Sequence, residues 1–560
     1  MAWWSRCRLP LLALLLAVYL WRAYAAAGSM SATFDEIIYP PAGLYYWQTG
    51  DFSLNYENPP LAKLWMALPL LARGLRAQIP TLADRQNPQY EYQYGLQFFQ
   101  ARPAEKMQLL RMTRMMNAAA GALLALLAGF LALRMAGPDA GLGAVALITW
   151  CPNLLAYGSV ATTEMPLTLF WLATVGCLAL TAESGKRGWL IAGGICLGLA
   201  LGSKSSALGL AATVPLLWGV AWLRGKSDVQ EFSRMLLWVF GLAGIVLVGM
   251  YHVTGLSQWW QGLKFDLGMV FLGSKGHLTY WAGNLSPVGW WYFFPVVLLL
   301  KMPLALVLTV LLAVVGIVRR RRLAQHPLLV YLWVAVGVLL LTSAVSNYQT
   351  GIRLVLPLLP LLYVIGAVEL RERWQAGIGG RWLVGVLLGW LAMSSLLIHP
   401  CYIGYFNELA GGTRGGMEKL IDCNCDWGQD LPALRDFLAE RGNPSIILSY
   451  FGNDDPADYG IHYMDLAMRS RTKMQPSRAD LANRDSVLLV VSATNRANVY
   501  YPENPGLFSW LETMEPLSIV GSSFYVYEIS DSDLAKKNIS ELLGFQGRNE
   551  DAAHIKSALR

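Results

Sequence analysis

The chain has 560 residues, of which 55% are hydrophobic and only 14% are charged, and its mean hydropathy is +0.39. Soluble domains contain about 25% charged residues, so this composition excludes a disordered chain, a fibre and a solenoid of soluble repeats, and seven cysteines are too few for a disulfide scaffold. The net charge of +7 comes from basic residues that flank apolar segments, where they orient a membrane protein, so we predict no nucleic-acid partner.

Eleven segments are apolar enough to cross a bilayer core of about 30 Å as helices. We place them at residues 9–27, 112–133, 140–157, 165–182, 189–203, 205–223, 235–251, 289–318, 327–345, 352–369 and 382–399. Alternate connections are short and basic, and they carry Arg6 and Arg8; Arg134; Lys186 and Arg187; Arg224 and Lys226; Arg319 to Arg322; and Arg371, Arg373 and Arg381. The positive-inside rule places these loops in the cytoplasm, and segments 28–111, 252–288 and 400–560 outside.

Two of these spans leave alternatives open. The first, with Arg6 and Arg8 before an apolar run and Ala23-Tyr24-Ala25 after it, is also compatible with a cleaved signal peptide, although we favour its retention. Span 289–318 contains Lys301, which is costly at that depth unless it faces a wet cavity or an anion. Snorkelling of Lys301 to the outer surface is the alternative.

The first external loop, residues 28–111, is too long for a simple connector. Asp35 and Glu36 lie near its start, and adjacent carboxylates at a membrane surface favour acid/base chemistry or the orientation of a hydroxyl nucleophile. Apolar surroundings raise the pKa of a carboxyl group, which suits a general base. The structural alternative is that Asp35 caps an interfacial helix.

Cationic residues gather at the external ends of the other spans. They are Lys63, Arg111, Arg114, Lys204, Lys275, His277 and Arg353. Each alone is typical of an interfacial anchor, but together they form an electropositive rim on the side of the two carboxylates. A lipid phosphate or pyrophosphate is the anion that such a rim suits, since arginine makes bidentate contacts with phosphate.

The segment from His399 onward is polar and rich in turn signals. Strands are predicted at residues 445–450, 486–491 and 523–529, and a short helix at 431–441. We therefore expect two domains: residues 1–399 in the membrane and an external α/β domain at residues 400–560.

Several motifs carry a resemblance to a known family. They are Gly50-Asp51-Phe52 with Glu57-Asn58-Pro59-Pro60-Leu61-Ala62-Lys63, Arg114 through Gly121, Thr162-Thr163-Glu164-Met165-Pro166-Leu167, Gly289 through Pro295 with Lys301-Met302-Pro303, Gly351-Ile352-Arg353, Tyr405-Phe406-Asn407-Glu408, and Asp422 through Leu431. With the Asp35-Glu36 pair, they resemble the GT-C membrane glycosyltransferases, in particular the protein O-mannosyltransferase and aminoarabinose-transferase-like group that uses phospholipid carriers. Cys423, Cys425 and Glu164 depart from the usual residues of that pattern.

The resemblance implies a polytopic α-helical membrane protein of the GT-C type with about eleven transmembrane helices. It implies a donor sugar on a polyprenyl phosphate and transfer, with inversion, to a hydroxyl of a protein, lipid or glycan on the external face. We expect a multi-pass protein of a bacterial inner membrane with a periplasmic C-terminal domain. Asp35 would orient and deprotonate the acceptor hydroxyl, and Glu36 would support that catalytic site or the sugar. The donor phosphate would be held by Arg114, Lys204, Lys301 and Arg353, and other substrate contacts would come from Glu57, Lys63, Glu164 and His277.

Other functions remain as alternatives: a lipid-linked glycan flippase or transporter, an oligosaccharyltransferase-like enzyme, or a membrane-anchored glycan-binding module. No cofactor is predicted, with a divalent metal left open. Asp422-x-Asn424-x-Asp426 is not an EF-hand loop, because Trp427 and Ala433 replace the required glycine and acid. One disulfide, from Cys401 to Cys423 or Cys425, is a further alternative.

Overall fold

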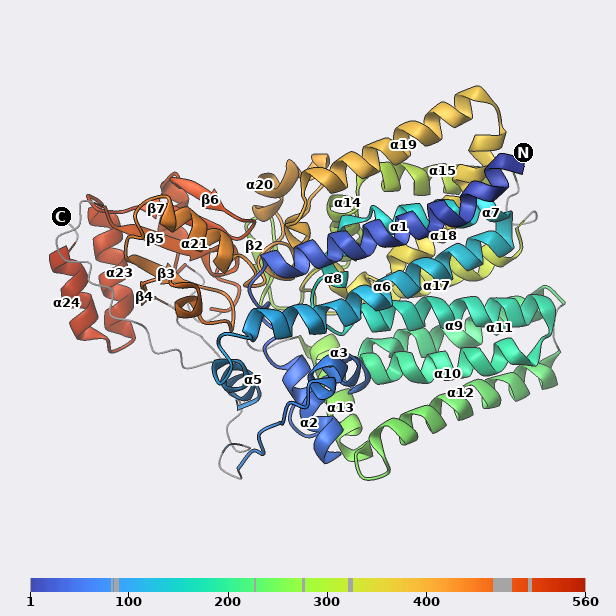
Figure 1. The fold of residues 1–560 in the computed structure, drawn as a ribbon, viewed down its shortest axis with the longest axis horizontal. Coiled ribbons are helices and arrows are strands. Elements are labelled where there is room, and N and C mark those ends of the chain that lie inside the picture. Colours follow the sequence, from blue (N-terminus) through green and yellow to red (C-terminus); the bar gives the residue numbers. More distant parts are fainter. Residues whose placement is uncertain are drawn as a thin grey trace.

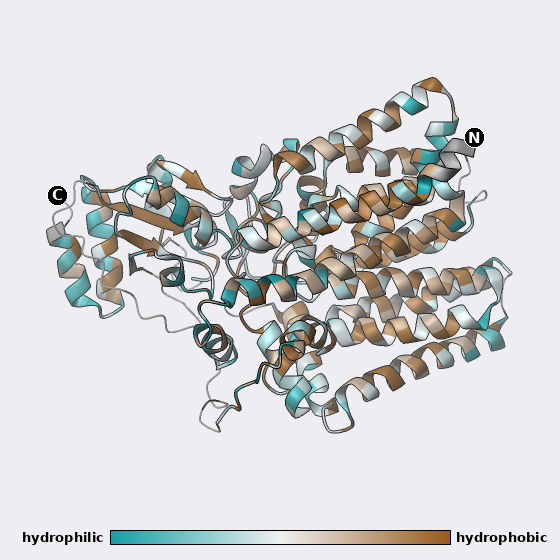
Figure 2. Cartoon of the chain, in the orientation of Figure 1, coloured by the Kyte–Doolittle hydropathy of each residue, from teal (hydrophilic) through white to brown (hydrophobic). Residues whose placement is uncertain are grey.

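A bundle of long helices with a sheet-containing region at one end makes up the fold (Figure 1). The computed structural model describes residues 2–81, 84, 90–225, 228–273, 277–320, 326–466, 486–501 and 506–558. The bundle helices are α1 (Ala2–Ser29), α6 (Lys106–Ala136), α7 (Pro138–Thr149), α8 (Pro152–Gly158), α9 (Glu164–Ser184), α10 (Arg187–Ser203), α11 (Leu208–Leu223), α12 (Val229–Tyr251), α14 (Phe293–Lys301), α15 (Leu304–Arg320), α17 (Leu328–Ala344), α18 (Leu358–Gln375) and α19 (Ile378–Leu397). Apolar residues dominate these helices, whereas polar residues are frequent in the sheet region (Figure 2).

Each of the eleven predicted spans falls on a helix or on a bent pair of helices. Within the described residues, six helices are long and apolar enough to cross a membrane, or eight if each of two bent pairs counts as one span. Helices α10 and α17, with 17 residues each, are shorter than this length. Near its end, helix α18 carries the charged residues Glu369, Arg371, Glu372 and Arg373, so its apolar part is short too. The mainly helical membrane fold is therefore confirmed.

Two of the predicted spans are broken by proline. Helices α14 and α15 meet at an angle of 117° around Met302 and Pro303, and α7 and α8 meet at 66° before Pro152. Proline has no N–H group and its ring clashes with the carbonyl group four residues earlier, so it favours a bend or a break in a helix. The unusual length of span 289–318 thus reflects two helices that run in different directions.

Polar contacts gather several basic segments at one end of the bundle. Arg8 Nη2 lies 2.9 Å from Asp139 Oδ1, and His326 Nδ1 lies 3.0 Å from the carbonyl oxygen of Met135. Arg224 Nη1 lies 2.6 Å from Glu183 Oε1. This end holds the N-terminus and faces away from the sheet region (Figure 1). Lys226, Arg321 and Arg322, which the basic-loop prediction includes, lie outside the described residues.

At the other end of the bundle, loop segments form short helices and a hairpin between the bundle and the sheet region (Figure 1). They are α2 (Tyr39–Thr49), α3 (Leu61–Ala72), α5 (Tyr90–Gln100), α13 (Leu256–Leu272), and the antiparallel strands β1 (Thr279–Trp281) and β2 (Asn284–Ser286). The glycine at position 50 ends α2 in a left-handed conformation with φ of 69°, which glycine adopts without steric cost. The first external loop is therefore largely folded.

The C-terminal region contains a mixed five-stranded sheet in the order β4-β3-β5-β7-β6. Its elements are α20 (Gly412–Met417), α21 (Leu431–Ala439), β3 (Ile446–Ser449), β4 (Tyr463–Asp465), β5 (Leu488–Ser492), α22 (Ala493–Arg496), β6 (Ser518–Val520), β7 (Phe524–Glu528), α23 (Asp533–Phe545) and α24 (Asn549–Ala558). Strand β3 is parallel to β4 and β5, and β7 is antiparallel to β5 and β6. The sequence predicts β3, β5, β7 and α21, but not the three-residue strands β4 and β6.

A buried ion-pair cluster fastens this region to the bundle. The Lys106 ammonium group at the start of α6 pairs with Asp454 and lies 2.5 Å from Asp458 Oδ2. Asp454 also accepts hydrogen bonds from the backbone N–H of Ala32, at 2.9 Å, and from the hydroxyl of Tyr459, at 2.8 Å. Because these charges are removed from water, each group requires its partners in place.

We predict that Lys106→Met lowers the stability of the protein substantially. The substitution leaves two carboxylates without their cation, and breaking a buried ion pair costs about 3–5 kcal/mol. Lys106→Met combined with Asp454→Asn should recover part of the loss, because the amide oxygen still accepts from Ala32. Thermal unfolding of the purified proteins in detergent measures both effects, and a wild-type midpoint for Lys106→Met would contradict the prediction.

Candidate active site

A cavity of about 1210 Å³ lies where the bundle, the first loop and the C-terminal region meet. Its polar lining includes Asp35, Glu57, Lys204, His277 and Arg353. Its apolar lining comes from α11, α13 and α17, and the sheet region contributes aromatic side chains. Of the ten residues that the sequence analysis selects, these five therefore line one cavity, although they are up to 318 positions apart in the chain.

The central contact of the cavity joins Asp35 and Arg353. Arg353 Nη1 lies 2.7 Å from Asp35 Oδ2 and 4.0 Å from Glu164 Oε1. Lys204 Nζ lies 2.7 Å from the same oxygen of Glu164, so two cations and two carboxylates alternate in one chain of contacts. The guanidinium also lies over the ring of Trp427, 4.8 Å from its centroid, which adds a cation–π contact.

Backbone contacts to the C-terminal region hold the segment that precedes Asp35. Ser31 N–H donates to the carbonyl oxygen of Gln429 at 3.0 Å, and Phe34 N–H donates to that of Trp427 at 2.9 Å. Asp454 accepts from the N–H of Ala32, which lies between them. The position of Asp35 is therefore fixed by residues some 400 positions later in the sequence.

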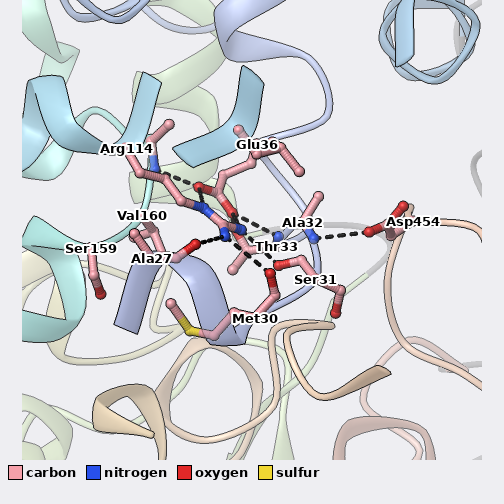
Figure 3. A network of polar contacts seen from close by, with 12 residues as sticks. Ala27, Met30, Ser31, Ala32, Thr33, Glu36, Arg114, Ser159, Val160 and Asp454 are labelled. Atoms are coloured by element: carbon pink, nitrogen blue, oxygen red, sulfur yellow. Dashed lines mark hydrogen bonds and ion pairs between the residues drawn. The ribbon is translucent and has the colours of Figure 1, made fainter. Parts of the chain in front are cut away.

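Glu36 and Arg114 form a closed polar network behind this segment (Figure 3). Arg114 Nε and Nη2 donate to the two carboxylate oxygens of Glu36 at 2.8 and 2.7 Å. The three remaining N–H groups of Arg114 donate to the carbonyl oxygens of Ala27, Met30 and Ser31. Arginine has five N–H donors, so every one of them is engaged.

With all these donors and acceptors used inside the protein, Arg114 and Glu36 differ from their expected roles in phosphate binding and catalysis. Both side chains are fully buried, and neither is part of the cavity lining. Glu36 also accepts from the backbone N–H groups of Thr33 and Ala161, at 2.8 and 2.6 Å. Arg114 consequently has no N–H left for a phosphate, and Glu36 has no exposed oxygen for an acceptor. The geometry suits both residues to positioning the loop that carries Asp35.

Lys63 and Lys301 are likewise engaged within the protein. Lys63 Nζ donates to the carbonyl oxygens of Asn55 and Asn58, at 2.5 and 2.6 Å, and so shapes the loop that carries Glu57. Lys301 Nζ donates to the carbonyl oxygens of Ile403 and Asn424, at 2.9 and 2.6 Å. Lys301 therefore neither snorkels to the surface nor faces the cavity. Its charge is satisfied by backbone carbonyl groups because α14 ends against the C-terminal region.

The remaining candidates surround the cavity in two groups. Glu164, at the start of α9, is buried behind Lys204 and Arg353 and contacts both. His277 lies apart from them, with Nε2 3.3 Å from Asp422 Oδ2, and that oxygen also accepts from the hydroxyl of Tyr500 at 3.0 Å. Lys275, which the expected rim includes, lies outside the described residues. Arg111 donates to the hydroxyl of Tyr24 at 3.0 Å. The Arg111 side chain does not line the cavity.

Two carboxyl groups of the cavity were not selected from the sequence. Asp422 belongs to a motif that the family pattern highlights, but the sequence indicates only a structural turn there. Asp266 on α13 has no motif signal, and its burial raises its pKa to about 6, against the opposing effects of a hydrogen bond from Ser205 and the charges of Lys204 and Lys63. Only the folded position of α13 reveals Asp266 as a cavity residue.

The alternative disulfide is wrong, since all three of its cysteines are free thiols. Cys423 Sγ contacts the carbonyl oxygen of Thr350 at 3.2 Å, and Cys425 Sγ contacts that of Leu420 at 3.4 Å. Both thiols are buried, so their short side chains fill the packing around the 422–430 segment. Across the described ranges, His, Cys, Asp and Glu side chains form no group of three or more that is arranged to hold a metal ion.

Comparison with protein families gives a match in the N-terminal part of the chain. Residues 11–255 match the family model of dolichyl-phosphate-mannose-protein mannosyltransferases. The matched segment covers less than half of the 560 residues, and it includes Asp35, Glu164 and Lys204. The match confirms the resemblance to membrane glycosyltransferases that the motifs indicate, and together with the apolar helices it identifies an integral membrane protein.

Several solved structures resemble the chain at low sequence identity, while no curated protein sequence matches it. ArnT from Cupriavidus metallidurans bound to undecaprenyl phosphate is 13% identical, with a TM-score of 0.47, and the match covers 92% of this chain and 97% of ArnT. The S. cerevisiae Pmt1-Pmt2 complex bound to its sugar donor is 19% identical, with a TM-score of 0.32 and coverages of 49% and 38%. The Archaeoglobus fulgidus oligosaccharyltransferase AglB with dolichol-phosphate is 13% identical, with a TM-score of 0.36 and coverages of 83% and 61%. At TM-scores below 0.5, none of these similarities says what this chain binds.

We predict that Arg114→Lys destabilises the protein strongly. Lysine has three donors and cannot reproduce the parallel pair of bonds to Glu36, so backbone carbonyl groups and a carboxylate are left buried without partners. The expected loss is about 3–5 kcal/mol, seen as a lower thermal midpoint and a lower yield of monodisperse protein. Arg111→Lys, one turn earlier on α6 and partly exposed, is the matched control. Equal midpoints for the two variants would refute the positioning role.

Proposed function

We propose that the protein is a glycosyltransferase that moves a sugar from a polyprenyl-phosphate donor to an acceptor hydroxyl group. The observation that carries this proposal is the contact of Asp35 with Arg353 in a cavity that is polar on one side and apolar on the other. A lipid-linked phosphosugar has the same division into a charged head and an apolar tail. The family match of residues 11–255 supports this chemistry and makes mannose the first sugar to test.

The donor phosphate is assigned to Arg353 and Lys204. Among the described residues, nothing accepts a hydrogen bond from Arg353 Nε, although this atom is buried. A buried donor without a partner is costly, and a phosphate oxygen would satisfy it. Lys204 has a partly exposed side chain on the cavity, which suits it to a second phosphate contact. Both groups would stabilise the negative charge that develops as the phosphate leaves.

The prenyl chain is assigned to the apolar side of the cavity. This wall is formed by Leu208 and Ala212 of α11, Phe271 of α13, and Leu339 and Val345 at or after α17. Phe271 and Val345 are also exposed at the outer surface, so this wall reaches the part of the bundle that lipid would surround. Burying a prenyl chain there removes apolar surface from water, which favours binding.

The proposed reaction is a single displacement with inversion. The acceptor oxygen forms a bond to the anomeric carbon of the sugar while the bond from that carbon to the phosphate oxygen breaks. Asp35 takes the proton of the acceptor hydroxyl, and the polyprenyl phosphate leaves with the bonding electrons. Because Arg353 pairs with Asp35, the arriving phosphate would draw the guanidinium away and free the carboxylate for the acceptor.

The proposal includes the arrangement across the membrane. Residues 1–399 would form the transmembrane domain and residues 400–560 the external domain, in the periplasm of a bacterial cell. The grouping of basic segments at the bundle end away from the sheet region supports this orientation. A flippase or transporter is less well supported, because such proteins bind substrate near the middle of the membrane, whereas the cavity here lies at one end of the bundle.

The test of the function is sugar release from labelled donors. Purified protein is incubated with polyprenyl-phosphate mannose and with other polyprenyl-phosphate sugars, and both free polyprenyl phosphate and the labelled product are measured. A protein, lipid or glycan product identifies the acceptor class. Intact donor after incubation with the whole panel and envelope extracts would overturn the proposal.

We predict that Asp35→Asn lowers turnover about 100-fold or more, the scale of a lost general base. The amide keeps the shape of the side chain, so donor binding should change little. Asp139→Asn, which changes a carboxyl group at the opposite end of the bundle, is the control and should keep wild-type turnover. Wild-type turnover of Asp35→Asn would remove this residue from the mechanism.

We predict that Arg353→Lys weakens donor use and that Arg353→Ala weakens it further. A charge-assisted hydrogen bond contributes roughly 1.5–3 kcal/mol, so the alanine variant should lose about 10- to 150-fold in apparent donor affinity or rate. Lysine keeps the charge but lacks the planar fork that binds two phosphate oxygens. Donor titration measures this, with Arg371→Lys near the C-terminal end of α18 as the control. Equal kinetics for all variants would leave Arg353 as a structural residue only.

A further inference from the structure

The sheet of the C-terminal region points the carboxyl ends of two parallel strands at the cavity. Tyr450, Phe451 and Gly452 directly follow β3, and Asn495 lies in the short helix α22 that follows β5. All four residues line the cavity. In open α/β sheets, ligands bind in the crevice outside the carboxyl ends of the strands. The fold itself therefore indicates a second binding surface, opposite the bundle helices to which the donor is assigned.

A polar cluster stands on this surface. The Asp422 carboxylate accepts from the Tyr500 hydroxyl at 3.0 Å and from the backbone N–H of Cys423 at 2.5 Å, and it lies 3.3 Å from His277 Nε2. Burial opposes ionisation of Asp422, but the hydrogen bond and charge of His277, with the charge of Arg353, lower its pKa overall. Asp422 is thus a fixed carboxylate that lines the cavity together with His277 and Tyr500.

Stacked aromatic rings connect this cluster with the residue next to Asp35. The ring of Phe34 stacks on Phe451 at a centroid distance of 5.2 Å, and Phe451 stacks on Tyr500 at 5.0 Å. Tyr500 in turn meets the ring of His277 edge-on at 5.1 Å. The aromatic row therefore runs along the cavity wall from the neighbour of Asp35 to the Asp422 cluster.

We propose that this wall is the acceptor subsite and that the acceptor is a saccharide, whose ring hydroxyl groups bind Asp422, Tyr500, His277 and Asn495. This inference rests on the proposed function, because the donor occupies the other side of the cavity. A few fixed polar side chains between aromatic surfaces are what orients a small polyhydroxylated ligand.

The geometry favours a saccharide over an extended peptide. A peptide that adds to a sheet needs an unpaired strand edge for its backbone groups. The edge strands here are β4 and β6, and no described residue of either strand lines the cavity. The groups that the wall offers are side chains: a carboxylate, a phenol, an imidazole and a carboxamide. These groups suit several hydroxyl groups on one sugar ring.

The test compares transfer with hydrolysis, in which water replaces the acceptor. The full-length protein receives labelled polyprenyl-phosphate mannose with either a glycan fraction of the cell envelope or a Ser/Thr-rich peptide. We expect label in the glycan fraction. Asp422→Asn and Tyr500→Phe should each reduce the ratio of transfer to hydrolysis about tenfold, the scale of one hydrogen bond to a charged group, and should raise the KM for the acceptor more than the KM for the donor.

Matched variants outside the cavity serve as controls. Tyr280→Phe removes a hydroxyl that donates to the carbonyl oxygen of Glu418, and Asp436→Asn changes an exposed carboxylate on α21. Both should keep the wild-type ratio. Three outcomes would each overturn the inference. They are label in the peptide, an unchanged ratio of transfer to hydrolysis in Asp422→Asn and Tyr500→Phe, and equal losses of transfer and hydrolysis in these variants.

A binding measurement separates this inference from the proposed function. Saturation-transfer NMR with neutral trisaccharides of glucose, galactose and mannose detects weak saccharide binding without any donor. We expect contacts for the wild type that fall at least threefold in Asp422→Asn but persist in Asp436→Asn. If the wild type consumes no donor yet shows these contacts, the function fails and the saccharide site stands. If it consumes donor but binds no trisaccharide and labels no glycan, the saccharide assignment fails alone.

Discussion

The hydrogen bonds that surround residues 31–34 determine how the site is built. This segment immediately precedes Asp35, yet its backbone groups are bound by the 427–429 loop and by Asp454 on one side and by Arg114 on the other. Arg114 is itself held by Glu36, whose carboxylate also accepts from the backbone N–H of Ala161. Backbone polar groups must be satisfied when they are buried. Four distant parts of the chain therefore meet at this segment, and the direction of the Asp35 side chain follows from all of them.

The charges of the protein divide into groups with different surroundings. Arg114, Lys63, Lys106 and Lys301 are buried and hydrogen-bonded to oxygens of the protein. Lys204 and Arg353 face the cavity and keep some exposure. This division separates cations that shape the site from cations that are available to an anion. It follows from burial and from the number of partners, which sequence position alone does not reveal.

The sequence predicts the parts of this protein whose signals are local. Apolar length and basic loops locate the membrane helices, and short runs rich in apolar residues between turn signals locate β3, β5 and β7. Asp35 and the cations Lys204 and Arg353 are brought to one cavity, as the predicted rim of cations suggests. The sequence fails where a role depends on distant partners: Glu36 and Arg114 carry the same motif signal as Asp35, but only the fold shows that their donors and acceptors are used up. Asp266 has no local signal at all.

The dependence of residues 31–34 on the 427–454 region has a consequence for how the protein is made. The first loop emerges from the ribosome early, but its partners at Gln429 and Asp454 are synthesised some 400 residues later. Until then the segment before Asp35 lacks the contacts that fix it, so a partly synthesised chain has no ordered site. The position of Asp35 is therefore fixed only once the C-terminal region has been synthesised and has folded against the first loop.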